Sequence, residues 1–141
     1  MAFEVVIAVN APEERVWAAL IDVEVWPQWT SSMTSVTRID SGDFAVGSRA
    51  RVKQPKIGTK TWTVTELTPA HSFVWEAKRP GLTLVAGHYL SSGDGETVNL
   101  TLKLEQKGLV GRLLEPFTER TAQRAVQLEA QGHKRRAETA D

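Results

Sequence analysis

Three side chains of this 141-residue chain have the types and positions to perform acid–base chemistry in an interior site. His88 falls on the more apolar face of the alternating segment 82–90, and histidine ionises near neutral pH. Glu66 falls by alternation on the apolar face of segment 60–67, where burial would raise its pKa and suit it to catalysis. If the alternation of this strand is shifted by one residue, Tyr89 faces the interior and becomes the candidate in place of His88. The alternatives are that His88 is a hydrogen-bonded structural residue and that Glu66 lies in solvent, at a strand end or beside a bulge.

Several other kinds of chemistry are excluded or get no support. The chain has no cysteine, so thiolate catalysis and cysteine-ligated zinc are impossible. His71, His88 and His133 lie on different predicted elements, without the spacing of a metal motif, and no glycine-rich phosphate loop or nucleophilic-serine motif occurs. We therefore expect no metal and no cofactor. The formal net charge of zero argues against a nucleic-acid partner.

The periodicity of apolar residues predicts one strand, two short helices, six strands and one long helix. Asn10 could cap the first helix, and Pro12 with two following carboxylates suits its first turn. Pro27 interrupts this region and predicts a second short helix that carries Trp29 and Met33. Turn residues separate the later strands. The predicted strands span residues 3–9, 36–40, 48–54, 60–67, 71–78, 82–90 and 97–105.

A single long helix is predicted from Gly108 to about Arg135. Pro116 should kink or restart it, because a proline inside a helix loses one hydrogen bond and clashes with the preceding turn. The apolar stripe that this helix should pack against the sheet consists of Leu109, Val110, Leu113, Leu114, Phe117, Thr121, Ala125 and Leu128.

Four segments follow one another along the chain: Ala11 to Leu20, Trp26-Pro27-Gln28-Trp29, Gly93 to Val98, and the final helix led by Gly108. Together with the order of the predicted elements, they resemble the START-like superfamily, also called SRPBCC or Bet v 1-like, and within it the polyketide cyclase/dehydrase and lipid-transport group. The resemblance implies an α+β helix-grip fold of one domain, residues 1–141, in the order β-α-α-β6-α, with a seven-stranded curved antiparallel sheet around the C-terminal helix. It also implies a hydrophobic ligand cavity between sheet and helix, but no common catalytic residues.

Residues expected to bind a ligand follow from the strand parity and from this implied cavity. The strands would supply the wall, the long helix would close it, and the two tryptophans beside Pro27 would either gate the mouth or only hold the short helices in place. The expected ligand-binding residues are Trp62, Val64, Trp75, Leu84, His88, Leu113, Phe117, Thr121, Trp26, Trp29 and Met33.

The leading functional hypothesis is binding of a small hydrophobic molecule: a lipid, a polyketide or an aromatic compound. The alternative is a cyclase, aromatase or dehydratase that uses His88, Glu66 or Tyr89. A further alternative is a protein-interaction module of the co-chaperone kind, using a basic stripe that would also permit peripheral membrane contact. No secretory signal or membrane-spanning segment is recognisable, so a cytoplasmic location follows by elimination. The stripe would consist of the outward-facing Arg49, Arg51 and Lys53 with Lys56 and Lys60.

Overall fold

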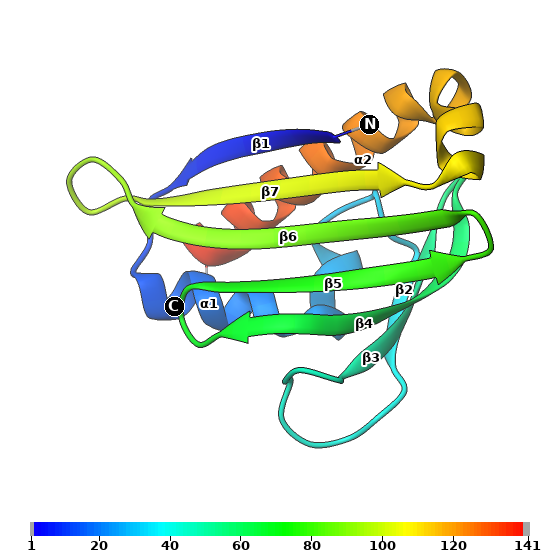
Figure 1. Cartoon of the computed structure of the whole chain (residues 1–141). Helices are drawn as coiled ribbons and strands as arrows, with labels where there is room; N and C mark the ends of the chain where they lie inside the picture. The colour runs from blue at the N-terminus through cyan, green and yellow to red at the C-terminus, as the bar shows by residue number, and fades with distance from the viewer. Residues whose placement is uncertain (1, 140–141) are drawn as a thin grey trace.

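One antiparallel sheet forms the body of the protein. The computed structural model describes residues 2–139, and within them seven strands are hydrogen-bonded in the order β1-β7-β6-β5-β4-β3-β2 (Figure 1). The sheet is strongly curved, and its alternating burial shows that one face packs against the interior. The strands are β1 Ala2–Val9, β2 Ser35–Arg38, β3 Arg49–Gln54, β4 Gly58–Thr68, β5 Ser72–Arg79, β6 Leu82–Ser92 and β7 Val98–Lys107.

Three helical elements lie on the inner side of the sheet. The long helix α2, Leu109–Thr139, runs behind the sheet, and α1, Glu13–Ile21, lies with the 3-10 helix η1, Val23–Gln28, near one end (Figure 1). This is the predicted helix-grip arrangement. No helix within residues 2–139 combines the length and the apolar character needed to span a bilayer.

The second short helix differs from the prediction. It begins at Val23, well before Pro27, and it ends before Trp29, which is its C-terminal cap. Met33 lies beyond it, in the connection to β2. The short 3-10 helix tolerates Pro27 because proline supplies no N–H in a segment with few helical hydrogen bonds to lose.

The helix α2 runs without interruption from Leu109 through Pro116 to Thr139, so it does not restart. Its first turns lie at an angle to the rest, which agrees with the kink predicted at Pro116 (Figure 1). The apolar stripe predicted for its first half does not pack against the sheet, since Leu113 is 67% exposed and Phe117 is 82% exposed. The helix packs instead through its second half, where the fully or nearly buried residues recur at helical spacing. They are Val126, Ala130, Gly132, His133 and Ala137.

Polar contacts fix this second half to the end of β1 and to the segments on either side of α1. Lys134 Nζ donates to the Ala8 carbonyl at 2.7 Å, and the backbone N–H of Asn10 donates to Glu138 Oε2 at 2.8 Å. Arg136 Nη2 lies 3.0 Å from Asp22 Oδ2.

The first turn of α2 is attached separately. The N–H groups of Val110 and Gly111 donate to the Gly81 carbonyl, and Gln106 Nε2 donates to the Gly111 carbonyl. The C-terminal half of α2 is therefore the more buried anchor, and the turns between the two attachments cross the sheet.

The close approach of α2 to the Trp29–Thr30 backbone yields a stability prediction. A Cβ added at Gly132 would lie 2.6 Å from the Trp29 carbonyl oxygen and 2.9 Å from Thr30 Cβ. Although alanine favours a helix by about 1 kcal/mol over glycine, we expect Gly132→Ala to destabilise the protein by about 1–3 kcal/mol through overpacking. Thermal unfolding followed by circular dichroism measures this. The exposed neighbour provides the control, Gln131→Ala, and an unchanged or raised Tm for Gly132→Ala would contradict the close packing.

Candidate functional site

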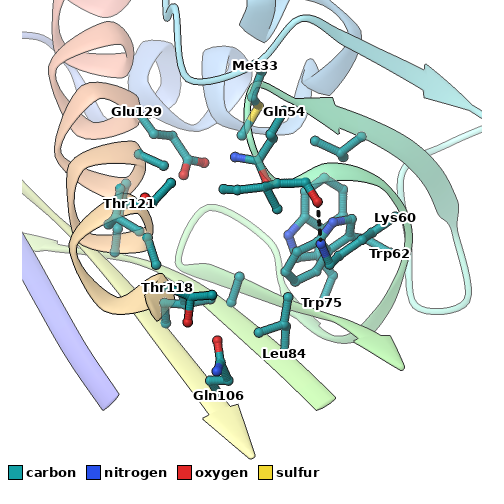
Figure 2. A pocket seen from close by; sticks show the side chains of 18 of the residues that line it. Met33, Gln54, Lys60, Trp62, Trp75, Leu84, Gln106, Thr118, Thr121 and Glu129 are labelled. Carbon is teal, nitrogen blue, oxygen red and sulfur yellow. Dashed lines mark hydrogen bonds between the residues drawn. The ribbon is translucent and has the colours of Figure 1, made fainter. Parts of the chain in front are cut away.

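A cavity of about 280 Å³ lies between the concave face of the sheet and α2. Strands β3 to β7 supply most of its wall, η1 and the following connection supply Trp26 and Met33, and α2 covers it from the other side (Figure 2). The wall is mainly apolar, and the polar groups are concentrated at separate places. Its apolar side chains include Val52, Leu84, Ala86, Leu102, Leu104, Leu114, Phe117, Ala125 and Val126.

Three tryptophans form an aromatic wall of this cavity. Trp62 of β4 and Trp75 of β5 are neighbours across the sheet, with ring centroids 5.7 Å apart and planes tilted by 34°. Trp26 meets Trp75 edge to face at 5.4 Å. The indole N–H of Trp26 donates to the Leu20 carbonyl at 3.1 Å, which satisfies its one polar atom and leaves the ring faces for packing.

The Trp26–Trp29 segment is therefore part of the packed interior. Trp26 is 1% exposed and also contacts the rings of Phe73 and His133. Trp29 does not line the cavity, and its carbonyl accepts a hydrogen bond from Arg135 on α2. Of the two roles left open by the sequence, the observed contacts are those of a structural corner that joins η1 to α2.

A buried polar cluster joins α2 to the sheet at one part of the cavity. Glu129 projects from α2 toward the cavity in Figure 2, and its Oε1 lies 3.6 Å from His88 Nε2 of β6 and 3.4 Å from His133 Nε2 of α2. The side chains of Glu129, His88 and His133 are only 12%, 2% and 5% exposed. On the other side of the His88 ring, Nδ1 lies 3.2 Å from the Phe73 carbonyl, and the ring stacks on Phe73 at 4.0 Å. The two histidines thus contact the same carboxylate oxygen from two directions. The described residues contain no group of three or more potential ligands placed to hold a metal ion.

The partners of this cluster determine its protonation. Burial alone would raise the pKa of the Glu129 carboxyl, but hydrogen bonds and charge interactions with His133 and His88 outweigh burial and lower the pKa from 4.5 to about 2. Glu129 is thus an ionised acceptor at neutral pH. The Phe73 carbonyl can only accept, so His88 Nδ1 donates to it, and the other ring nitrogen, Nε2, faces the Glu129 carboxylate beside the cavity.

Lysine side chains occupy another part of the wall. Lys60 of β4 lines the cavity, and its ammonium donates to the Ile57 carbonyl at 3.2 Å, which pins the β3–β4 turn (Figure 2). Partial burial and the charge of Arg79 lower the pKa of Lys60. Lys56 and Ile57 also border an outer depression of about 290 Å³ beside α2. The turn therefore separates the cavity from the surface.

The predicted basic stripe is only partly on the surface. Arg49, Arg51 and Lys53 are exposed on the outer face of β3, as predicted. Lys60 is different, because the alternation in β4 places it on the same face as Trp62, and its side chain is half-buried in the cavity wall. The stripe as predicted therefore loses one of its five members.

The structure brings most of the expected ligand-binding residues to the cavity and excludes three. Leu113 points to solvent because the first half of α2 is rotated away from the predicted orientation. Val64 is 1% exposed but packs in the core beyond the cavity, and Trp29 lies at the corner described above. The expected residues that line the cavity are Trp26, Met33, Trp62, Trp75, Leu84, His88, Phe117 and Thr121.

Two of the three proposed acid–base residues lie elsewhere. A β-bulge interrupts the pairing of β4 with β5 between Val64 and Glu66, which leaves the Glu66 side chain exposed instead of inward. Tyr89 lies on the outer face of β6, where its ring covers Gly87 and Lys103 lies 5.2 Å from its centroid. His88 alone of the three reaches the cavity.

Glu129 was not among the predicted site residues, and it is not part of the apolar stripe predicted for α2. A signal was present: Val126, Ala130, His133 and Ala137 recur at intervals of four, three and four residues, and Glu129 is four residues before His133. Such spacing identifies the face of the second half of the helix that turns toward the sheet, and Glu129 lies at the edge of this face.

Solved structures with this arrangement have the same fold at low sequence identity. A protein from Thermus thermophilus matches with a TM-score of 0.79 at 17% identity, over 97% of both chains. A START superfamily protein from Mycobacterium smegmatis matches with a TM-score of 0.73 at 12% identity, over 95% of this chain and 97% of the other. The di-domain ARO/CYC protein StfQ of the steffimycin biosynthetic pathway matches with 0.77 at 12%, over 97% of this chain and 50% of that chain.

The seven-stranded sheet and the long helix thus define the helix-grip fold of START-like and Bet v 1-like proteins. The chain belongs to the family described as polyketide cyclase / dehydrase and lipid transport, which matches residues 1–138. No curated protein matches the sequence.

The ionised Glu129 predicts an acid-sensitive contribution to stability. Its pKa in the folded protein lies below the ordinary value of 4.5, so its contribution is fully present above pH 4.5 and is lost as the pH falls toward 2. The difference in unfolding free energy between wild type and Glu129→Gln, from urea titrations, should therefore shrink over this range. Exposed Glu14 provides the control, Glu14→Gln, which removes a carboxylate without a buried contact. A constant difference from pH 7 to pH 2.5 would show that Glu129 is not a stabilising buried carboxylate.

Proposed function

We propose that the protein binds a small hydrophobic molecule in the cavity between the sheet and α2. The observation that carries this proposal is the cavity itself, about 280 Å³ of space with three tryptophans and many aliphatic side chains in its wall. Folded proteins are close-packed, so a space of this size lined by apolar groups is a binding site more often than a packing defect. The family description, which includes lipid transport, supports the same reading.

The shape of the wall favours a ligand with a flat ring system. Trp62 and Trp75 present neighbouring indoles at the cavity, and their mutual tilt of 34° leaves a broad aromatic surface. Moving an apolar ligand from water onto this surface contributes about 25 cal/mol per Å² of buried area. Polar groups at Glu129, His88 and Lys60 would orient the ligand.

Filling the cavity from the sheet side tests this function. Ala86 lines the cavity on β6, whereas its neighbour Val85 faces the other side of the sheet. We expect Ala86→Phe to weaken binding of the neutral fluorescent probe N-phenyl-1-naphthylamine at least about tenfold, because the added ring occupies the ligand space. Val85→Phe, which adds the same ring on the opposite face, should bind the probe like wild type. Absence of probe binding to the wild-type protein, together with no co-purifying organic molecule in native mass spectrometry, would refute the function.

A second candidate function is catalysis of dehydration or cyclisation on a polyketide-like substrate. The specific observation in its favour is the His88–Glu129 pair, which places Nε2 of an imidazole against a carboxylate beside the cavity. Elimination of water from a β-hydroxy thioester needs a base to take the α-proton and an acid to protonate the departing hydroxyl, and one histidine can do both in sequence. StfQ, a structural relative, is named as an ARO/CYC protein.

Conversion of 3-hydroxy-3-phenylpropanoyl N-acetylcysteamine thioester to the cinnamoyl thioester and water tests this candidate. If His88 is the acid–base residue, His88→Asn should lower the rate by about 10²–10⁴-fold. His71 is exposed, and His71→Asn should leave the rate unchanged. A wild-type rate equal to the uncatalysed background for this thioester would count against catalysis and would leave the binding function untouched.

A further inference from the structure

The carboxylate of Glu129 has one oxygen engaged by the protein and one that is not. Both histidine contacts are made by Oε1, at 3.6 Å from His88 Nε2 and 3.4 Å from His133 Nε2. Among the described residues, no hydrogen bond reaches Oε2. Figure 2 shows the carboxylate directed toward the open space between α2 and the sheet. Among the described residues the one buried side-chain nitrogen or oxygen without a partner is Arg38 Nε, so water can reach Oε2 from the cavity. A ligand donor that replaces this water would gain the strong hydrogen bond of an ionised oxygen.

The charge balance at this point of the cavity limits what can supply the donor. Glu129 is ionised and is contacted by two imidazole rings, and the rest of the wall around it is apolar. A ligand carboxylate would place two anions side by side, and a ligand ammonium would have to leave water for this apolar wall. A hydroxyl group adds no charge and supplies one hydrogen. The cavity wall around the cluster is aromatic, with Trp26 contacting both His88 and His133 at ring distances of 5.6 and 4.8 Å.

We propose that Glu129 is the anchoring residue of the cavity and that it selects a neutral hydrophobic ligand carrying a hydroxyl group, a phenol or an alcohol, which donates to Glu129 Oε2. The proposal rests on the binding function above and names the chemical class of the ligand. The hydroxyl would lie against the His88–Glu129 pair, and the apolar body of the ligand would extend along Trp75 and Trp62. The acceptor is fixed in place because His88 and His133 hold the carboxylate from two elements.

Three naphthalene probes that share one ring system test the selection. 2-Naphthol offers a hydroxyl donor, 2-methoxynaphthalene offers only an acceptor, and 2-naphthoate is an anion. Isothermal titration of the wild-type protein at pH 7 should give about tenfold or more tighter binding of 2-naphthol than of 2-methoxynaphthalene, the range expected for a hydrogen bond to a charged acceptor. 2-Naphthoate should bind most weakly.

Removal of the acceptor should abolish the preference without closing the cavity. In Glu129→Met, which keeps a side chain of similar length, 2-naphthol and 2-methoxynaphthalene should bind with affinities within about twofold of each other. Glu119→Met on the exposed side of the same helix is the matched control and should keep the wild-type preference. If Glu129→Met does not fold, the order of the three probes on the wild-type protein decides the question.

The outcomes separate this proposal from the function on which it rests. Equal binding of all three probes, or an unchanged preference for 2-naphthol in Glu129→Met, would overturn the anchoring role while the binding function stands. Tighter binding of 2-naphthoate than of 2-naphthol would overturn it as well, and would assign the polar selection to the lysine part of the wall. Failure of every probe and of N-phenyl-1-naphthylamine to bind would remove the binding function and this proposal together.

Discussion

A wide curved sheet covered by one narrow helix is the constraint on which the rest of this structure depends. Neighbouring strands lie about 4.8 Å apart, so seven strands span roughly 29 Å, whereas a helix with its side chains is about 10–12 Å across. A single α2 cannot fill the concave face that such a sheet encloses. The helices α1 and η1 fill one end, and the space that remains is the cavity. The cavity is therefore a consequence of the architecture before any particular side chain is considered.

The polar cluster has little structural justification in a fold arranged this way. Removing charged groups from water costs several kcal/mol each, and well-packed apolar residues often replace a buried ion pair without loss of stability. The helix has other attachments, because Lys134, Arg136 and Glu138 tie it to the β1–α1 region at the surface. The helix is therefore held by other contacts as well as by the pair formed by Glu129 and His88, which lies on the cavity wall.

The sequence predicts the fold well because the fold follows from periodicity and turn chemistry. Alternation in β7 and the glycine- and proline-rich turns locate the strands within a few residues, and the order of elements carries the resemblance to the superfamily. Alternation also correctly directs Trp62, Trp75 and His88 inward. It fails at Glu66, where the bulge after Val64 shifts the parity by one residue, and nothing local in a run of threonines and valine signals a bulge.

The site is less predictable than the fold because its decisive contact joins His88 to Glu129, two residues far apart in the chain. Helix α2 has two stripes at helical spacing, an apolar one in its first half and one of small residues and histidine in its second half. Spacing alone does not tell which of the two stripes packs against the sheet. Large exposed side chains such as Leu113 and Phe117 made the first stripe the stronger signal. The small residues prevailed because only Gly132 and Ala130 permit the backbone of α2 to approach the Trp29–Thr30 backbone closely.

The helix α2 is divided into an anchored half and an exposed half. This division places the contacts that stabilise the fold and the side chains that shape the cavity in different parts of one helix, although the two usually constrain each other in evolution. Residues 126–137 hold most of the buried side chains of the helix and its contacts with the β1–α1 region. Most of residues 109–122 are exposed, apart from the buried Gly111, and several of them contribute side chains to the cavity wall. Substitutions at these exposed positions can change the shape of the cavity at little cost to folding, since exposed positions change stability by only about 0.5 kcal/mol. The cavity can therefore change by drift in half of one helix while the other half keeps the fold.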